Sequence, residues 1–354
     1  MRRSWLVAAL AACFVAAAAA AATRATAAAP SSFGVADGGD IQTLPTADLV
    51  RYLDGVRQAG ARWIRVGIYW AVIQRAGPKS YDWKPFDRVV NAARRRRLAV
   101  LGVLLYTPDW ARVKGTPGGA PPRDLRDYAA FAGRAARHFG ARVRAYEIWN
   151  EPNIAGFWAP GPSPAAYTAM LELAYRAIKR ARPAATVVSG GLSPFGRYGA
   201  ADAQHMNPIT FLEQMYANGA RGSMDAVGWH PYNFPWGLGY YDWSAWSQMS
   251  ATTPSARSVM RANGDGRKRI WATEWGAPTG SSGESVTEAG QAGLVATGLR
   301  RLRSLPWAGP SFLYSYRDTG TNASDRLQNF GIVRRDWSAK PAYTAFRRMA
   351  RRRS

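Results

Sequence analysis

The sequence predicts a (β/α)8 barrel, an α/β fold in a single domain. The first observation is an alternation, over about 310 residues, of eight strand-like apolar runs with eight amphipathic segments that carry helix signals. The second is that the fourth and seventh of these runs end in a glutamate, Glu151 and Glu274. The third is that no linker or composition shift interrupts the alternation once it has begun.

The expected strands are short and rich in β-branched and aromatic residues. They are Phe33–Val35, Trp63–Ile68, Ala99–Leu105, Val143–Trp149, Thr186–Ser189, Ala226–Trp229, Ile270–Thr273 and Ser311–Ser315.

The expected helices begin at capping residues or prolines, which favour the first turn of a helix. They are Ala47–Ala59, Phe86–Arg97, Arg123–Phe139, Pro164–Arg182, Pro208–Asn218, Pro254–Asn263, Thr287–Leu305 and Pro341–Arg351.

The N-terminus is typical of a secretory signal peptide. Two arginines precede an unbroken apolar run from Trp5 to Ala22, and small residues suited to cleavage follow. We therefore expect a signal peptide over residues 1–29, a folded domain over residues 30–354, and a secreted, extracellular or periplasmic location. Two alternatives stay open: a transmembrane anchor, and a lipid anchor at Cys13, against which the continuation of the apolar run argues.

Cysteine and histidine usage restricts the chemistry. Cys13 is the only cysteine, so a mature chain would have no thiol for a disulfide, for catalysis or for metal binding. The three histidines, His138, His205 and His230, are not at metal-ligand spacing. We expect neither a metal nor another cofactor.

The formal net charge of +24 raises the question of an anionic partner. A coding bias toward arginine explains it without a partner. The functional alternative is long-range attraction to an acidic envelope polysaccharide, a cell wall or a membrane surface. No nucleic-acid-binding motif occurs in the sequence, so no specific nucleic-acid partner is expected.

Two carboxylates are expected to face each other at one end of the barrel. Glu151 follows the fourth strand in Asn150-Glu151-Pro152, and Glu274 follows the seventh in Thr273-Glu274-Trp275-Gly276. The carboxyl ends of barrel strands form the active-site face. Facing carboxylates can cleave a glycosidic bond, because one protonates the leaving oxygen while the other attacks or stabilises the anomeric carbon.

These motifs resemble the clan of retaining (β/α)8 glycoside hydrolases whose acid/base and nucleophile are glutamates at the ends of strands four and seven. The resemblance extends over the predicted folded domain. It implies that Glu151 is the acid/base, that Glu274 is the nucleophile, and that Asn150 contacts the sugar 2-hydroxyl. The element Trp229-His230-Pro231-Tyr232 implies that Tyr232 bonds the nucleophile and that His230 lines the site, and Arg65 matches an arginine near the nucleophile.

The segment Thr107–Ala111 is similar to the β-xylosidase and iduronidase group, with the cellulase-like family as the rival. Strand eight departs from the clan, because it carries tyrosines where a tryptophan often forms the floor of the site. We take Tyr316 as the substrate-binding residue there.

The environment expected for each glutamate assigns its role. A nearby Arg65 and a hydrogen bond from Tyr232 would lower the pKa of Glu274 and keep it ionised. Glu151 is expected to be partly buried beside this anion and to be protonated before the reaction. Strict alternation would put Asn150 and Glu151 on opposite faces, so the strand must become irregular there. Glu147 is expected inside the barrel, paired with a cation or hydroxyl.

Aromatic residues are dense in the loops that follow strands three, four and six. Sugar C–H faces stack on aromatic rings, so we expect part of this set to bind substrate. The candidates are Trp110, Trp158 and Trp236. The alternative is that these side chains pack the loops.

The sequence therefore predicts an enzyme that hydrolyses O-glycosyl bonds of a β-linked poly- or oligosaccharide with retention. A catalytically silent carbohydrate-binding or cell-wall-binding barrel is the alternative.

Overall fold

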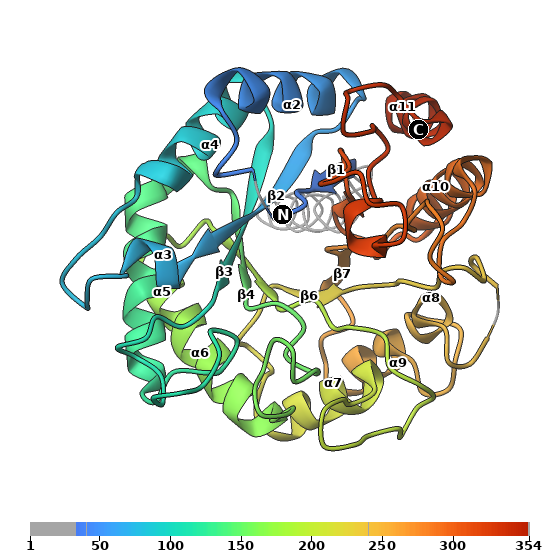
Figure 1. Cartoon of the computed structure of the whole chain (residues 1–354). Helices are drawn as coiled ribbons and strands as arrows, with labels where there is room; N and C mark the ends of the chain where they lie inside the picture. The colour runs from blue at the N-terminus through green and yellow to red at the C-terminus, as the bar shows by residue number, and fades with distance from the viewer. Residues whose placement is uncertain (1–32, 40, 240, 353–354) are drawn as a thin grey trace, which may run out of the picture. The chain divides into compact units, whose positions relative to one another are not determined.

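The computed structural model describes residues 33–352, apart from residues 40 and 240. The predicted signal peptide lies outside the described residues. Eight parallel strands form one sheet, surrounded by helices (Figure 1). The strands are β1 (Phe33–Ala36), β2 (Trp63–Tyr69), β3 (Ala99–Leu105), β4 (Ala145–Ile148), β5 (Thr186–Ser189), β6 (Ala226–Trp229), β7 (Arg269–Ala272) and β8 (Ser311–Tyr314).

The helices follow the strands as predicted, with two short additions, α3 and α8. They are α2 (Thr46–Gln58), α3 (Trp70–Ile73), α4 (Lys84–Arg95), α5 (Leu125–Phe139), α6 (Pro164–Ala181), α7 (Pro208–Ala217), α8 (Ala245–Gln248), α9 (Ala256–Ala262), α10 (Glu288–Ser304) and α11 (Pro341–Arg351), with 3-10 turns η1 (Gly140–Arg142) and η2 (Arg326–Gln328). No helix among the described residues is both long and apolar enough to cross a bilayer.

The strands are arranged in the order β7-β6-β5-β4-β3-β2-β1-β8. Parallel bridges between Ile270 and Ala308 and between Trp275 and Leu313 join the two ends of this order and close the sheet. The chain is therefore a (β/α)8 barrel, which confirms the predicted fold class.

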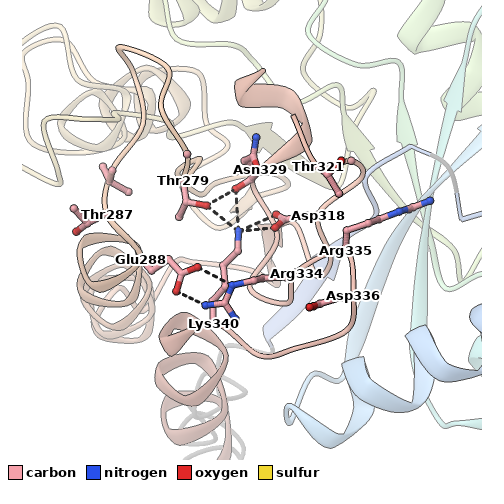
Figure 2. Close-up of a pocket in the computed structure, with 13 residues that line it drawn as sticks. Thr279, Thr287, Glu288, Asp318, Thr321, Asn329, Arg334, Arg335, Asp336 and Lys340 are labelled. Atoms are coloured by element: carbon pink, nitrogen blue, oxygen red, sulfur yellow. Dashed lines mark hydrogen bonds and ion pairs between the residues drawn. The ribbon is translucent and has the colours of Figure 1, made fainter. Parts of the chain in front are cut away.

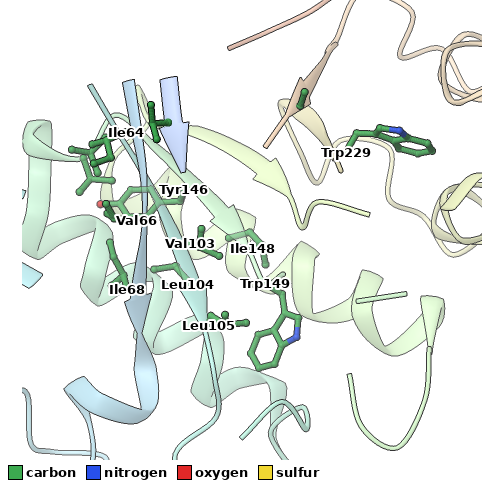
Figure 3. Close-up of a cluster of buried hydrophobic side chains, with 14 of the residues drawn as sticks. Ile64, Val66, Ile68, Val103, Leu104, Leu105, Tyr146, Ile148, Trp149 and Trp229 are labelled. Carbon is green, nitrogen blue, oxygen red and sulfur yellow. The ribbon is translucent and has the colours of Figure 1, made fainter. Parts of the chain in front are cut away.

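Alternation along each strand sorts the core into two parts. In β2, Ile64, Val66 and Ile68 belong to the larger core that includes helix residues, and Figure 3 shows part of it around β2, β3 and β4. The barrel interior holds a separate cluster that includes Trp63, Trp271 and Phe312. Since Arg65 lies between Ile64 and Val66, it belongs to the inner face with Trp63.

Candidate active site

A pocket of about 560 Å³ lies at the carboxyl ends of the strands, and both glutamates line it. Its lining also includes Asn150 next to Glu151, Tyr232 after β6, and Tyr314 at the end of β8. The segments after β4, β6, β7 and β8 therefore meet at one site, where a barrel fold places its reactive groups.

The backbone becomes irregular where β4 ends, as the sequence required. The strand stops at Ile148, and Trp149 and Glu151 have positive φ values of 71° and 43°. Such values are strained for bulky residues and persist only where surrounding structure holds them. The Trp149 side chain is fully buried, and the Glu151 amide donates to the Gly191 carbonyl at 3.0 Å. This break in alternation lets the adjacent residues Asn150 and Glu151 both line the pocket.

Arg65 connects three acceptors beneath the pocket. Its Nε donates to Glu147 Oε2 at 2.6 Å, its Nη2 donates to Asn150 Oδ1 at 2.7 Å, and its Nη1 is paired with Glu274. Burial lowers the pKa of Arg65, but the charges of Glu147 and Glu274 raise it by more, so the net pKa lies above the usual arginine value. The guanidinium is therefore a permanent cation that orients Glu274. Asn150 Oδ1 already accepts a hydrogen bond from Arg65. The Asn150 NH2 group is therefore left to donate to a sugar hydroxyl.

Glu274 is held in its ionised form. Tyr232 Oη donates to Glu274 Oε2 at 2.9 Å, in addition to the Arg65 pair. Burial raises the pKa of Glu274, but the charges of His230 and Arg65 and the Tyr232 hydrogen bond together lower it below its usual value. An ionised carboxylate at neutral pH is the state that a nucleophile needs.

His230 links the two glutamates. Its Nδ1 lies 2.9 Å from Glu151 Oε1 and 3.8 Å from Glu274 Oε2. These two carboxyl oxygens are therefore no further apart than the sum of the two distances. That limit includes the retaining separation of about 5–5.5 Å and reaches only the lower end of the inverting range of about 6.5–9.5 Å. Burial lowers the pKa of His230, but the Glu274 charge and the contact with Glu151 raise it by more, so the net shift is upward.

Glycine is required at Gly191, where the segment after β5 passes the His230 imidazole. A Cβ at this position would lie 2.1 Å from His230 Nε2 and 2.5 Å from Thr273 Oγ1. The Gly191 amide also donates to Glu147 Oε1 at 2.9 Å. The missing side chain thus lets this backbone segment pass close to His230 while its amide bonds Glu147.

Comparison with solved structures gives several matches to (β/α)8 glycoside hydrolases. A family 39 glycoside hydrolase from Bacteroides cellulosilyticus WH2 aligns over 91% of this chain, with 23% identity and a TM-score of 0.70. A GH5_18 structure from Streptomyces cattleya, in complex with GlcNAc, aligns over 92% with 16% identity and a TM-score of 0.68. Xylanase 10B from Thermotoga maritima aligns over 90% with 17% identity and a TM-score of 0.62.

The chain has the fold of these glycoside hydrolases. The alignments cover 63%, 80% and 94% of the three matched chains, so the chain spans less than two thirds of the first. No protein-family model and no curated protein matches the chain.

Five of the predicted substrate-binding residues are absent from the described pocket lining. Arg65 and His230 lie behind it and contact its glutamates, whereas Trp110, Trp158 and Tyr316 pack elsewhere. Trp158 is 1% exposed and packs edge-on against Trp149 and Tyr167 in the core. Tyr316 is 5% exposed and packs against Tyr52 of α2. The structure places both rings in the core and not at the pocket, a distinction that the sequence pattern could not make.

Trp110 also packs inward in this glycoside hydrolase fold. Its ring lies edge-on to Trp70, and its indole N–H donates to the Gln74 carbonyl at 2.8 Å. It is absent from the described pocket lining. Trp236, in contrast, lines the pocket and is 61% exposed.

Several aromatic residues at the site were not selected from the sequence. Tyr314, Phe330 and Phe234 line the pocket, and all three contact the Tyr232 ring. Tyr314 could have been found, because in β8 it has the parity of the inward-facing Phe312 whereas Tyr316 comes after the strand has ended. Phe330 lies in the loop before α11, where the sequence carries no periodic signal.

A second pocket of about 500 Å³ lies beside α10 and the loop that precedes α11 (Figure 2). At its base, Lys340 Nζ donates to Thr279 Oγ1 at 2.9 Å, to Asp318 Oδ2 at 2.8 Å and to the Asn329 carbonyl at 3.3 Å. Burial lowers the pKa of Lys340 despite the Asp318 charge, and raises the pKa of Asp318 despite the ammonium.

This cluster supports the wall of the pocket that holds Glu151 and Glu274. Asp318 Oδ1 also accepts from the Gly331 amide at 2.8 Å, directly after Phe330. Lys340 therefore joins the loop after β7, which contains Thr279, to the loop after β8, which carries Phe330. Because the charged groups at its base are already paired, we interpret the second pocket as structural. Among the described residues, no cluster of three or more His, Asp or Glu side chains could hold a metal ion.

Proposed function

We propose that the protein is a retaining glycoside hydrolase that cleaves a β-linked poly- or oligosaccharide by double displacement. The observation that carries this proposal is that the buried imidazole of His230 lies close to both pocket glutamates. That contact keeps the two carboxyl groups close enough to include the retaining separation of about 5–5.5 Å and excludes most of the inverting range of about 6.5–9.5 Å.

In the first step, a Glu274 oxygen attacks the anomeric carbon and forms a glycosyl ester. The bond to the leaving oxygen breaks, and Glu151 gives that oxygen its proton. Arg65 and Tyr232 keep Glu274 ionised and oriented, so no proton has to leave the nucleophile before attack.

In the second step, Glu151 takes a proton from water as the water oxygen attacks the same carbon. Glu274 leaves as a carboxylate, and its charge is again stabilised by Arg65 and by the Tyr232 hydroxyl. Two inversions at one carbon give net retention. Asn150 is suited to hold a hydroxyl of the reacting sugar through its NH2 group, because Arg65 fixes its carbonyl oxygen.

The pocket itself favours a neutral sugar. Its charged lining among the described residues consists of Glu151, Glu274 and Glu284 with Arg326, and Arg326 is paired with Glu284. We therefore propose that the basic surface, with a formal net charge of +24, acts by long-range attraction to an acidic envelope. A secreted, extracellular or periplasmic location agrees with this proposal.

Replacement of the nucleophile tests the function. Glu274→Ala should lower kcat on aryl β-glycosides and on xylo-oligosaccharides by about 10⁴-fold or more. Azide should restore turnover of the aryl glycoside and give a glycosyl azide of inverted configuration, because it occupies the space of the deleted carboxylate. Xylo-oligosaccharides are included because one of the matched structures is a xylanase.

Glu284→Ala is the matched control, since Glu284 is a carboxylate at the rim of the same pocket. It should retain most of the wild-type activity. Equal activity of Glu274→Ala and the wild type would contradict the proposal.

A further inference from the structure

We propose that the active-site pocket continues into a neighbouring hollow, and that the two together bind several consecutive sugars of a β-linked chain. This inference deepens the proposed function and rests on it. It assigns an extended binding site to the loops after β5 and β6, and it predicts cleavage within a chain.

The two hollows share a boundary. The lining of the active-site pocket includes Gly196 and Trp243. The neighbouring hollow, of about 430 Å³, is lined by the adjacent residues Arg197 and Asp242; we call it the second hollow, and it is distinct from the Lys340 pocket. An ion pair joins Arg197 Nε to Asp242 Oδ2 at 2.8 Å across this boundary. The two hollows therefore lie on either side of one joined pair of loops, and a chain that runs over these loops reaches from the pocket to the second hollow.

Exposed hydrophobic side chains gather along this path. Among the described residues, six large hydrophobic side chains are exposed, and four of them line one of the two hollows: Trp236 (61%), Leu327 (60%), Tyr198 (48%) and Tyr241 (43%). Exposed apolar surface concentrated beside a pocket marks a ligand- or partner-binding region.

The aromatic rings form a supported row. Trp243 lies edge-on to Trp236 with 5.3 Å between ring centroids, and it stacks on Tyr241 at 5.0 Å with 12° between the planes. Trp243 thus connects the ring at the pocket mouth with a ring in the second hollow. Tyr198 Oη donates to Glu213 Oε2 at 2.8 Å, which restrains the tyrosine on the opposite loop.

A buried amide fixes the two loops relative to each other. Gln248 is fully buried, and its Nε2 donates to the Gly196 carbonyl at 2.9 Å and to the Asp242 carbonyl at 2.8 Å. Because one side chain bonds both sides of the boundary, the row of rings is held in place before a ligand binds. Preorganisation of this kind lowers the entropic cost of binding.

The chemistry of the second hollow matches a sugar chain. Beside its two tyrosines, its lining offers the hydroxyl groups of Thr252 and Thr253 and the Arg197–Asp242 ion pair, which is solvent-exposed, unlike the buried pair of Lys340 and Asp318. A β-linked pyranose has apolar C–H faces that cover aromatic rings and hydroxyl groups at its edge that bond polar side chains. An amphipathic peptide helix binds instead in a hydrophobic groove, and the charged and hydroxyl-bearing side chains of this lining do not form one.

Binding to a protein that cannot turn over substrate tests the extended site separately from catalysis. Glu274→Gln protein is titrated calorimetrically with a panel of β-1,4- and β-1,3-linked hexasaccharides and with the matching disaccharides. At least one hexasaccharide should bind tenfold or more tightly than its disaccharide. Tyr241→Ala should weaken hexasaccharide binding by about tenfold, the scale of one lost aromatic contact, and leave the disaccharide affinity unchanged.

Tyr241→Phe keeps the ring and should retain hexasaccharide binding, and Val113→Ala is a matched exposed control that lines neither hollow. Equal hexasaccharide and disaccharide affinities, no binding by any panel member, or an unchanged ratio in Tyr241→Ala would each overturn the extended site. Self-association that Tyr241→Ala abolishes, measured by light scattering, would identify the row as an interface between copies and also overturn it. If the wild type hydrolyses aryl glycosides but the affinity does not depend on the length of the oligosaccharide, the extended site is refuted and the proposed function is not.

Discussion

Removal of the Tyr232 hydroxyl is the most informative small change at the proposed active site. The hydroxyl donates to Glu274 Oε2 at 2.9 Å, while the ring is held by edge contacts with Phe234, Tyr314 and Phe330. Tyr232→Phe therefore deletes one hydrogen bond and leaves the packing in place. A hydrogen bond to a charged group contributes about 1.5–3 kcal/mol, and each 1.36 kcal/mol is about tenfold in rate.

The loss should appear mainly in the second half-reaction. Glu274 leaves the glycosyl enzyme as a carboxylate, so the hydrogen bond strengthens as that charge develops. We expect kcat to fall by about ten- to a hundredfold, with a pre-steady-state burst of the first product, measured by stopped flow on an activated aryl glycoside.

The pH profile supplies an independent test of the same change. Because the pKa of Glu274 is lowered, activity that needs its ionised form is present above that pKa and is lost as the pH falls through it. Removal of the Tyr232 hydrogen bond takes away one of the causes of the lowering, so the acid limb of kcat/KM should move to higher pH. An unchanged kcat together with an unchanged acid limb would refute the assigned role of Tyr232.

Three further changes test other parts of the structure. Lys340→Met should destabilise the fold by roughly 3–5 kcal/mol in chemical denaturation, because it leaves Asp318 buried and unpaired, and adding Asp318→Asn should recover most of that loss. Gly191→Ala should abolish activity and lower the melting temperature, since its Cβ would meet His230 Nε2 at 2.1 Å; wild-type activity would contradict this. Trp158→Ala should lower the free energy of unfolding by about 3–5 kcal/mol, the usual cost of truncating a core tryptophan. A variant of unchanged stability that binds substrate more weakly would instead show that Trp158 binds substrate.

The barrel could be predicted from the sequence because its signals are local and repeated. Each strand-like run and each helix cap occupies a few adjacent residues, and the alternation of eight pairs leaves few other architectures. The irregular end of β4 was also predictable, since Asn150 and Glu151 could not both face the pocket from a regular strand. The structure meets this requirement with positive φ values at Trp149 and Glu151.

The allocation of aromatic rings to core or pocket could not be predicted in the same way. Trp158 and Trp236 both occur in loops near expected strand ends, yet one is 1% exposed and the other 61% exposed. That difference depends on which rings meet after the chain has folded, as Trp158 meets Trp149 and Tyr167. The link through His230 and the Lys340 cluster are likewise tertiary, because each joins residues from separate loops.

Trapping of the glycosyl enzyme tests the central claim most directly. A 2-deoxy-2-fluoro aryl β-glycoside slows the hydrolysis of the covalent intermediate, and peptide mass spectrometry then locates the sugar. The account predicts one label per chain, on the peptide that contains Glu274, and no label in Glu274→Ala. A label on Glu151 or on another carboxylate would contradict the assignment of the nucleophile.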